Sequence, residues 1–147
     1  MKTVLFSALL ISLLSLGFIN APQEQLTWHS NYQEAVKKAQ KENKRLLLNF
    51  TGSDWCGWCI KLDKEVFSQK EFVEYADKNL VCVKLDFPRA KKLPETEVQQ
   101  NYKLQEKYQV QGYPTIIILD KTEKLLGKTG YQKGGGKAYA EHLEKFK

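Results

Sequence analysis

The stretch FTGSDWCGWCIKLDKEVF, residues 50–67, sets Cys56 and Cys59 between an apolar run and a helical pattern. The preceding run, RLLLNF at 45–50, has no polar alternation until its fifth residue, as in a strand buried on both faces. Residues 51–54, TGSD, have the chemistry of a turn. Apolar residues then recur at helical spacing from about 56 to 66. The stretch therefore predicts a cysteine pair at a strand-to-helix junction.

Two thiols at the start of a helix suit redox chemistry. The first turn of a helix leaves amide N–H groups unpaired and carries a partial positive charge, which stabilises a thiolate. Cys56 gains most from this position, and Cys59 lies one turn further along the helix. We therefore expect Cys56 to attack a substrate disulfide and Cys59 to resolve the mixed disulfide.

Two other interpretations of the cysteine pair stay open at this point. A structural metal site needs four ligands, whereas the pair supplies two, and Cys82, His29 and His142 are scattered along the chain. A purely structural disulfide would close a loop so short that it would stabilise little. We favour the redox interpretation, with no metal and no cofactor other than the cysteine pair itself.

The rest of the chain alternates between strands and helices. Capping boxes at Ser30–Gln33 and Ser68–Glu71 predict the starts of two helices. Besides the elements above, the patterns predict helices at 32–42, 72–76, 99–108 and 137–146 and strands at 80–86, 115–119 and 125–131. Strand–helix–strand order implies parallel strands, and the last two strands form an antiparallel hairpin. We expect an α/β fold with a central mixed sheet and helices on both faces.

The segment VQGYPT, residues 110–115, carries a second signal. Pro114 stands just before an internal strand, although proline cannot donate to a strand ladder. A cis bond between Tyr113 and Pro114 would make a tight entry to this strand, whereas an ordinary trans turn is the alternative.

The N-terminal segment has the features of a targeting sequence. Lys2 precedes an apolar stretch at 4–19, which is shorter than the ~20 residues needed to span a bilayer. We predict a signal peptide at 1–21, with an uncleaved anchor or a buried helix as alternatives. The mature domain would be 22–147, located in the periplasm or secreted.

Charge and cysteine content narrow the function further. The net charge is +6, but lysines are interleaved with acidic residues along the chain, so we expect a solvated surface and no nucleic-acid binding. The chain has three cysteines, and an odd number in an oxidising compartment leaves one unpaired. Cys82 alternates with Val81 and Val83 in a predicted strand, which favours a place in the core, with a regulatory thiol as the alternative.

Together these features resemble the thioredoxin superfamily, and in particular small exported bacterial thioredoxin-like proteins. The resemblance covers about residues 26–147 and rests on Trp55-Cys56-Gly57-Trp58-Cys59 and Gly112-Tyr113-Pro114-Thr115. It implies that Cys56 attacks, that Cys59 resolves and that Pro114 is a cis-proline facing them. It also implies that the Tyr113 backbone pairs with an extended substrate and that Trp55 packs beside the disulfide. The implied substrate-binding residues are Trp55, Gly57, Trp58, Tyr113 and Pro114.

The chain departs from the family pattern at Asn49 and at Gly57-Trp58. Asn49 stands where members commonly carry a buried aspartate that accepts a proton, and an amide cannot do so at neutral pH. Lys84 stands where the family often has a lysine near that aspartate, and a solvated lysine at the end of the strand is the alternative. Gly57-Trp58 replaces the Gly-Pro that thioredoxin usually has between the cysteines. Because this dipeptide tunes the redox potential, the direction of thioredoxin's reaction cannot be transferred to this chain. Trp58 is either packed against the connection at 88–94 or offered to substrate.

These observations predict an exported thiol–disulfide oxidoreductase. We favour a reductase of protein disulfides, because a histidine between the cysteines would make a stronger oxidant and none is present. Such an enzyme needs an electron donor, which we expect to be a membrane thiol relay. A thiol oxidase or isomerase is the alternative, although this single domain, expected to be a monomer, has no dimerisation platform. A non-catalytic module that binds extended peptides is the rival from another class.

Overall fold

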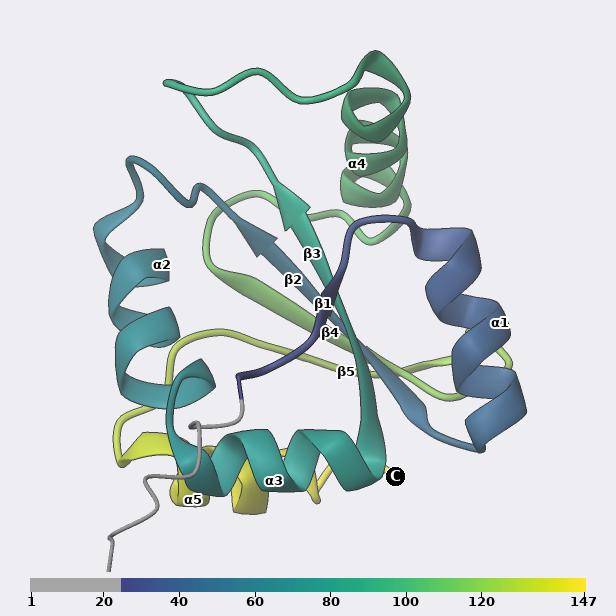
Figure 1. Cartoon of the computed structure of the whole chain (residues 1–147), viewed down its shortest axis with the longest axis vertical. Coiled ribbons are helices and arrows are strands. Elements are labelled where there is room, and N and C mark those ends of the chain that lie inside the picture. Colours follow the sequence, from purple (N-terminus) through teal and green to yellow (C-terminus); the bar gives the residue numbers. More distant parts are fainter. Residues whose placement is uncertain (1–24) are drawn as a thin grey trace, which may run out of the picture.

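A five-stranded mixed sheet lies at the centre of the computed structural model, which describes residues 25–147 (Figure 1). The strand order is β1-β3-β2-β4-β5. β1 and β2 run parallel to β3, whereas β4 is antiparallel to β2 and β5. The strands are β1 (Trp28–His29), β2 (Arg45–Thr51), β3 (Leu80–Asp86), β4 (Thr115–Leu119) and β5 (Leu125–Thr129). The predicted signal peptide at 1–21 lies outside the described residues, and the predicted domain boundary at 22 does too.

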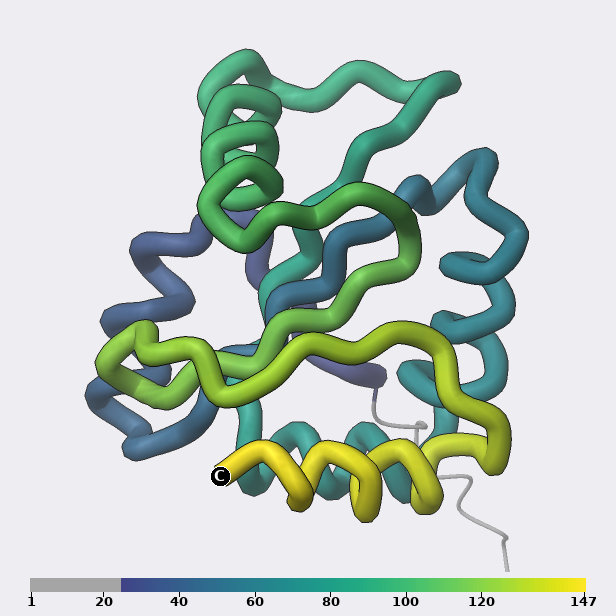
Figure 2. Tube along the Cα trace, turned by 180° about the vertical axis from the view of Figure 1, so that it is seen from behind, coloured from purple at the N-terminus to yellow at the C-terminus, as the bar shows by residue number. Residues whose placement is uncertain are grey.

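Helices cover both faces of this sheet, as predicted (Figures 1 and 2). The helical segments are α1 (Tyr32–Glu42), α2 (Gly57–Leu62), the π-helical η1 (Asp63–Phe67), α3 (Lys70–Asn79), α4 (Glu95–Lys107) and α5 (Gly135–Leu143). α1 and α4 pack on one face, and α2, η1, α3 and α5 pack on the other. Within residues 25–147, the helices are too short or too polar to cross a membrane.

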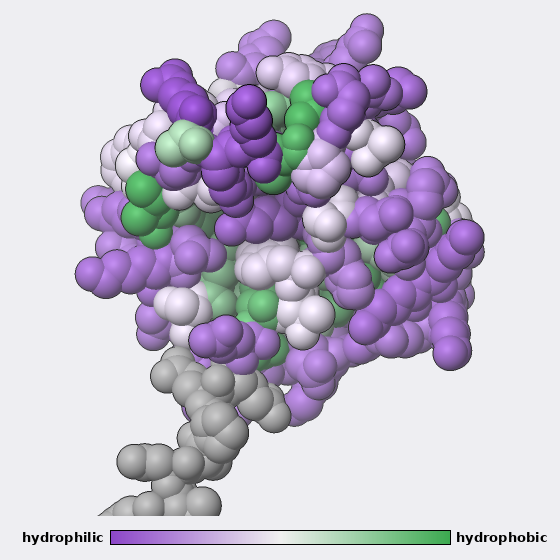
Figure 3. Space-filling view, turned by 45° about the horizontal axis from the view of Figure 1, so that its top comes forward, coloured by the Kyte–Doolittle hydropathy of each residue, from purple (hydrophilic) through white to green (hydrophobic). Residues whose placement is uncertain are grey.

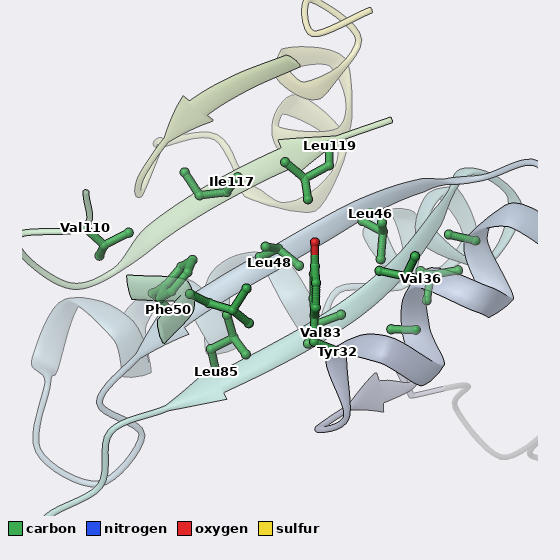
Figure 4. Close-up of a cluster of buried hydrophobic side chains, with 14 residues drawn as sticks. Tyr32, Val36, Leu46, Leu48, Phe50, Val83, Leu85, Val110, Ile117 and Leu119 are labelled. Atoms are coloured by element: carbon green, nitrogen blue, oxygen red, sulfur yellow. The ribbon is translucent and has the colours of Figure 1, made fainter. Parts of the chain in front are cut away.

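Strand β2 is buried on both faces, which confirms the interpretation of the apolar run. Leu46, Leu48 and Phe50 point into the cluster beneath α1 and α4 (Figure 4). Leu47 points into the opposite cluster, with Phe67, Phe72 and other side chains of η1, α3 and α5. Because side chains alternate along a strand, one continuous apolar run fills two cores.

The predicted capping boxes are wrong at both helices. Asn31 caps α1, because its Oδ1 accepts a hydrogen bond from the N–H of Glu34 at 3.1 Å. Gln69 precedes α3 and makes no side-chain cap. Ser68 instead ends η1, where its N–H donates to the Asp63 carbonyl and its hydroxyl donates to the Lys64 carbonyl. Ser68, which was expected to start α3, therefore ends the π-helical segment η1, and the sequence analysis did not predict that segment.

Other boundaries differ by a few residues. α4 begins at Glu95 rather than near 99, directly after Pro94, and acidic residues in its first turn complement the helix dipole. α5 begins at Gly135 rather than 137. Gly136 lies so close to α3 that an added Cβ would stand 2.8 Å from the Cβ of Gln69. β1 was missed because two residues are too few to show a strand pattern.

Arg45, at the start of β2, ties the sheet to the C-terminus. Its guanidinium donates to the carbonyls of Leu143 and Phe146 at 3.0 and 2.8 Å. It also donates to the Tyr75 hydroxyl and to the Glu144 carboxylate, at 2.6 and 2.9 Å. The side chain is mostly buried, so these charge-assisted bonds are partly shielded from water.

We predict that Arg45→Ala lowers the free energy of unfolding by about 2 kcal/mol, because it removes four charge-assisted hydrogen bonds from a mostly buried site and leaves the Phe146 carbonyl without the guanidinium donor. Urea denaturation followed by far-UV circular dichroism measures this value. Lys70→Ala is the matched control, because it breaks an exposed pair with Glu74 and should cost less than about 0.5 kcal/mol. Equal losses in the two variants would contradict a special role for Arg45.

Candidate active site

Cys56 and Cys59 form a disulfide at the N-terminus of α2, with 5.2 Å between their Cα atoms. Cys56 is the N-cap residue, and its Sγ accepts a hydrogen bond from the N–H of Cys59 at 3.2 Å. Both residues are nearly buried, with exposed fractions of 7% and 5%. An amide that points at Sγ of Cys56 would stabilise a negative charge there after reduction.

The turn before the cysteines has a close-packed backbone. The Cys56 N–H donates to the Gly52 carbonyl at 2.9 Å, which closes the turn onto the end of β2. A Cβ at Gly52 would lie 2.5 Å from the Trp55 ring, so only glycine lets the indole fold back over this turn. The turn therefore sets the positions of Trp55 and Cys56 together.

Trp55 is fixed on the side of the site that faces the β3–α4 connection, residues 87–94. Its Nε1 donates to the Phe87 carbonyl at 2.8 Å. Its ring makes an edge contact with Tyr113, at 6.0 Å between centroids, and the Arg89 guanidinium lies 3.9 Å from the ring centre. Trp55 is still 38% exposed, so part of the indole stays open to solvent next to the disulfide.

The Tyr113–Pro114 peptide bond is cis. The Tyr113 ring stacks on Phe87 at 5.0 Å, and its hydroxyl donates to Gln105 at 3.1 Å. Burial raises the pKa of Tyr113. The structure thus joins Trp55 and Tyr113, two of the predicted substrate-binding residues, through direct ring contact.

Trp58 lies on a different side, away from the β3–α4 connection. It is 57% exposed, and its ring packs beside Tyr131 at 5.3 Å, with the Lys61 ammonium 5.3 Å from the indole centre. Of the two alternatives for Trp58, packing against 88–94 is therefore wrong, because Trp55 and Arg89 occupy that side. The other alternative, contact with substrate, stays a prediction. Gly57 is also exposed, with open space where a Cβ would stand.

Tyr131 is a residue of this site that the sequence analysis missed. Its hydroxyl donates to the Glu65 carboxylate, and its ring lies next to Trp58 and Lys61. It follows β5, more than seventy positions after the cysteines. An aromatic residue just after the last strand was the only local signal, and it does not indicate which surface it will join.

Asn49 and Cys82 lie in the buried sheet beneath the site. Asn49 is 5% exposed, its register partner on β3 is Lys84, and its Oδ1 has no hydrogen-bond partner among the described residues. Cys82 is 2% exposed, which confirms its placement in the core, and burial raises the pKa of its thiol to about 12. A thiol in that state is unreactive at neutral pH.

Two carboxylates hold the loops on either side of Trp55. Asp86, at the end of β3, accepts hydrogen bonds from the N–H and hydroxyl of Ser53 and forms an ion pair with Lys91 at 2.8 Å. Asp54 accepts hydrogen bonds from the N–H groups of Arg89 and Ala90. These bonds join the turn before the cysteines to the β3–α4 connection.

Hydrogen bonding governs the pKa of both carboxyls. Burial raises the pKa of Asp86, but hydrogen bonds from Lys91 and Ser53 outweigh it and leave the value below the ordinary 3.8. The backbone hydrogen bonds from Arg89 and Ala90 lower the pKa of Asp54. Both groups are therefore ionised at neutral pH. Within residues 25–147, no three His, Cys, Asp or Glu side chains are arranged to hold a metal ion.

Comparison with known proteins gives consistent similarities. The family model described as a thioredoxin-like domain matches residues 32–147. The chain is 38% identical over 119 residues to the disulfide bond reductase DsbH of Chlamydia pneumoniae, which covers 81% of this chain and 71% of that protein. It is 33% identical over 111 residues to the thioredoxin-related protein DsbJ of the same organism, covering 76% of this chain and 32% of DsbJ.

Solved structures show the same similarity. A structure described as DsbH oxidoreductase superposes with a TM-score of 0.78 and 36% sequence identity. The match covers 82% of this chain and 83% of the other.

We predict that Asp86→Asn lowers the free energy of unfolding at pH 7 by about 2 kcal/mol, because an amide cannot serve both Ser53 and the Lys91 ammonium. Asp86 has its pKa depressed in the folded state, so its contribution is present above pH 3.8 and is lost as pH falls below that value. The difference between variant and wild type should therefore narrow from pH 7 to pH 3 in urea denaturation. Asp77→Asn, at an exposed position of α3, is the control. A pH-independent difference would contradict this role for the Asp86 charge.

Proposed function

The chain belongs to the thioredoxin-like family, and on this basis we propose that it is an exported oxidoreductase that reduces disulfides in periplasmic protein substrates. The disulfide between Cys56 and Cys59 at the start of α2 is the observation that carries the proposal. The family and this disulfide support thiol–disulfide redox activity. The pair itself is the only redox group that the reaction requires.

The proposed reaction moves one electron pair from the protein to the substrate. In the reduced protein, the Cys56 thiolate attacks one sulfur of a substrate disulfide; a mixed disulfide forms and the other substrate sulfur leaves as a thiolate. Cys59 then loses its proton and attacks Sγ of Cys56, which releases the second substrate thiolate. The substrate gains two electrons and, after protonation, two thiols, while the protein returns to the disulfide form.

The amide at position 49, where related proteins commonly carry an aspartate, bears on the second step. Cys59 must lose a proton before it attacks, and the Asn49 amide is not a base at neutral pH. We therefore assign this proton to solvent at the small part of the pair that is open, since Cys56 is 7% and Cys59 5% exposed. Trp55, Gly57, Trp58, Tyr113 and Pro114 would surround the substrate segment, with the Tyr113 backbone pairing with it.

Two observations favour the reductase direction. The relative with 38% identity is named a disulfide bond reductase. In addition, residues 57 and 58 between the cysteines are Gly and Trp, so no histidine is present to stabilise the thiolate and strengthen oxidation. A reductase must be recharged, and we propose a thiol relay in the membrane as the electron donor. The apolar segment at 4–19 supports export, and the protein would act as a monomer.

Replacing Cys59 by Ser should trap substrates. We expect Cys59→Ser to accumulate mixed disulfides through Cys56 in periplasmic extracts, visible as bands on non-reducing gels that dithiothreitol removes, because no second thiol releases them. Adding Cys82→Ser should leave the bands unchanged, whereas Cys56→Ser/Cys59→Ser should abolish them. A non-catalytic peptide-binding module would instead retain its partners without either cysteine. Failure of Cys59→Ser to trap any protein would contradict the attack–resolve mechanism.

The reduction potential tests the direction of the reaction. We expect equilibration of the Cys56–Cys59 pair in dithiothreitol and glutathione buffers to give about −250 mV or lower, as for a thioredoxin-like reductant. The fraction of reduced protein can be read from alkylation and mass spectrometry. A value near −120 mV, as for a strong oxidant, would reverse the proposed direction and leave the family assignment intact.

A further inference from the structure

A cavity of about 480 Å³ lies between the β3–α4 connection and α4, and Trp55, the residue before Cys56, forms part of its wall. Its walls are mostly apolar and aromatic, contributed by Trp55, Phe87, Pro88, Leu93, Val98, Tyr102 and Tyr113. The top of Figure 1, which carries this connection, faces the viewer in Figure 3, where small hydrophobic patches lie among hydrophilic side chains. The volume falls within the range of cavities that bind small organic groups.

The cavity shares its walls with the redox site. Trp55 immediately precedes Cys56, and Tyr113 immediately precedes Pro114. The two rings contact each other, and both line the cavity. A substrate segment whose cysteine reaches Cys56 would therefore pass the mouth of the cavity within a few residues.

Two cations at the rim have no partner carboxylate. Lys91 is neutralised by Asp86, and Asp54 is occupied by backbone amides. The Arg89 guanidinium lies 3.9 Å from the centre of the Trp55 ring, and Arg89 makes no ion pair within residues 25–147. Lys92 is exposed and likewise unpaired in that part of the chain. The rim is thus able to accept a negative charge, while the walls accept an apolar side chain.

We propose that this cavity selects substrates by binding a large apolar side chain, flanked by a carboxylate, in the protein segment that carries the attacked cysteine. This inference rests on the proposed function, because it assumes that protein disulfides reach Cys56. The apolar side chain of the substrate would be removed from water when it packs against Phe87 and Tyr102, and this burial favours binding in proportion to the apolar area buried. The carboxylate would meet Arg89 and Lys92 at an exposed rim, where complementary charges mainly raise the association rate.

Three peptides test the two parts of this pocket. Each is a symmetrical disulfide dimer of an end-blocked heptapeptide, with the test residues on both sides of the central cysteine. The first contains Phe and Glu, the second contains Phe and Lys, and the third contains Ser and Glu. Rates of oxidation of the pre-reduced protein are followed by tryptophan fluorescence and divided by the rate of each peptide with dithiothreitol, which removes differences in intrinsic reactivity.

We expect the Phe/Glu peptide to react about fivefold faster than either of the others. High salt should remove the advantage over Phe/Lys, because exposed charges are screened, and should leave the advantage over Ser/Glu. Arg89→Glu/Lys92→Glu should make the Phe/Lys peptide react faster than the Phe/Glu peptide. Lys92→Glu alone should reduce the preference for Phe/Glu and leave the contact between Arg89 and the Trp55 ring intact. Tyr102→Ala should reduce the advantage over Ser/Glu.

Matched controls lie on other surfaces. Lys78→Glu makes the same charge change as Lys92→Glu, but on α3. Leu125→Ala removes an apolar side chain on β5 that is 53% exposed, against 60% for Tyr102. Neither should change the order of the three peptides.

The failure of this inference is distinct from the failure of the proposed function. If all three peptides are reduced at equal normalised rates, the pocket is not selective and the proposed reductase activity stands. If none is reduced, the proposed function fails. In that case the pocket is tested by calorimetry, which measures how tightly the oxidised protein binds the same peptides with serine in place of cysteine. Tighter binding of the Phe/Glu peptide supports the inference, and equal binding of the three peptides overturns it.

Discussion

Burial of strand β2 on both faces is the constraint on which the rest of this structure depends. β2 is the middle strand of the sheet, hydrogen-bonded to β3 on one edge and β4 on the other. Its side chains enter two separate cores, so a shift of one residue would exchange the two sets and place Asn49 among the apolar side chains under α1. This fixed register determines where the chain leaves the sheet at Thr51. The turn, Trp55 and the disulfide follow from that exit point.

The two sides of the disulfide are built differently. On the Trp55 side, carboxylates, ring stacking and an indole N–H bond hold the β3–α4 connection in place. On the Trp58 side, an exposed indole rests on Tyr131, beside a lysine. The first side has a cavity with defined walls, and the second presents an open aromatic surface. Under the proposed function, these two surfaces would give a substrate and an electron donor different places to bind around one reactive pair.

Local sequence patterns predicted the central strands, α1, the mixed sheet and the cysteine pair, because each depends on residues close together in the chain. β2 and β4 are continuous apolar runs, and the Trp55–Cys59 segment carries its own helix start. The capping residues, η1 and the start of α4 were mispredicted, because neighbouring polar residues offer several caps and tertiary packing selects among them. Tyr131 and Arg89 could not be assigned to the site, since their neighbours there are tens of residues away. The roles of the predicted site residues stay predictions.

Asp54 holds the β3–α4 connection through the backbone N–H groups of Arg89 and Ala90. Backbone amides are present whatever side chains follow, apart from proline, so this anchor does not depend on the identity of those residues. Substitutions in the connection can therefore accumulate while its attachment to the turn before the cysteines is kept. The side chains of the connection can therefore diversify while the turn that carries the cysteines stays the same. Duplicated genes could in this way give proteins that bind different substrates and share one proposed reaction.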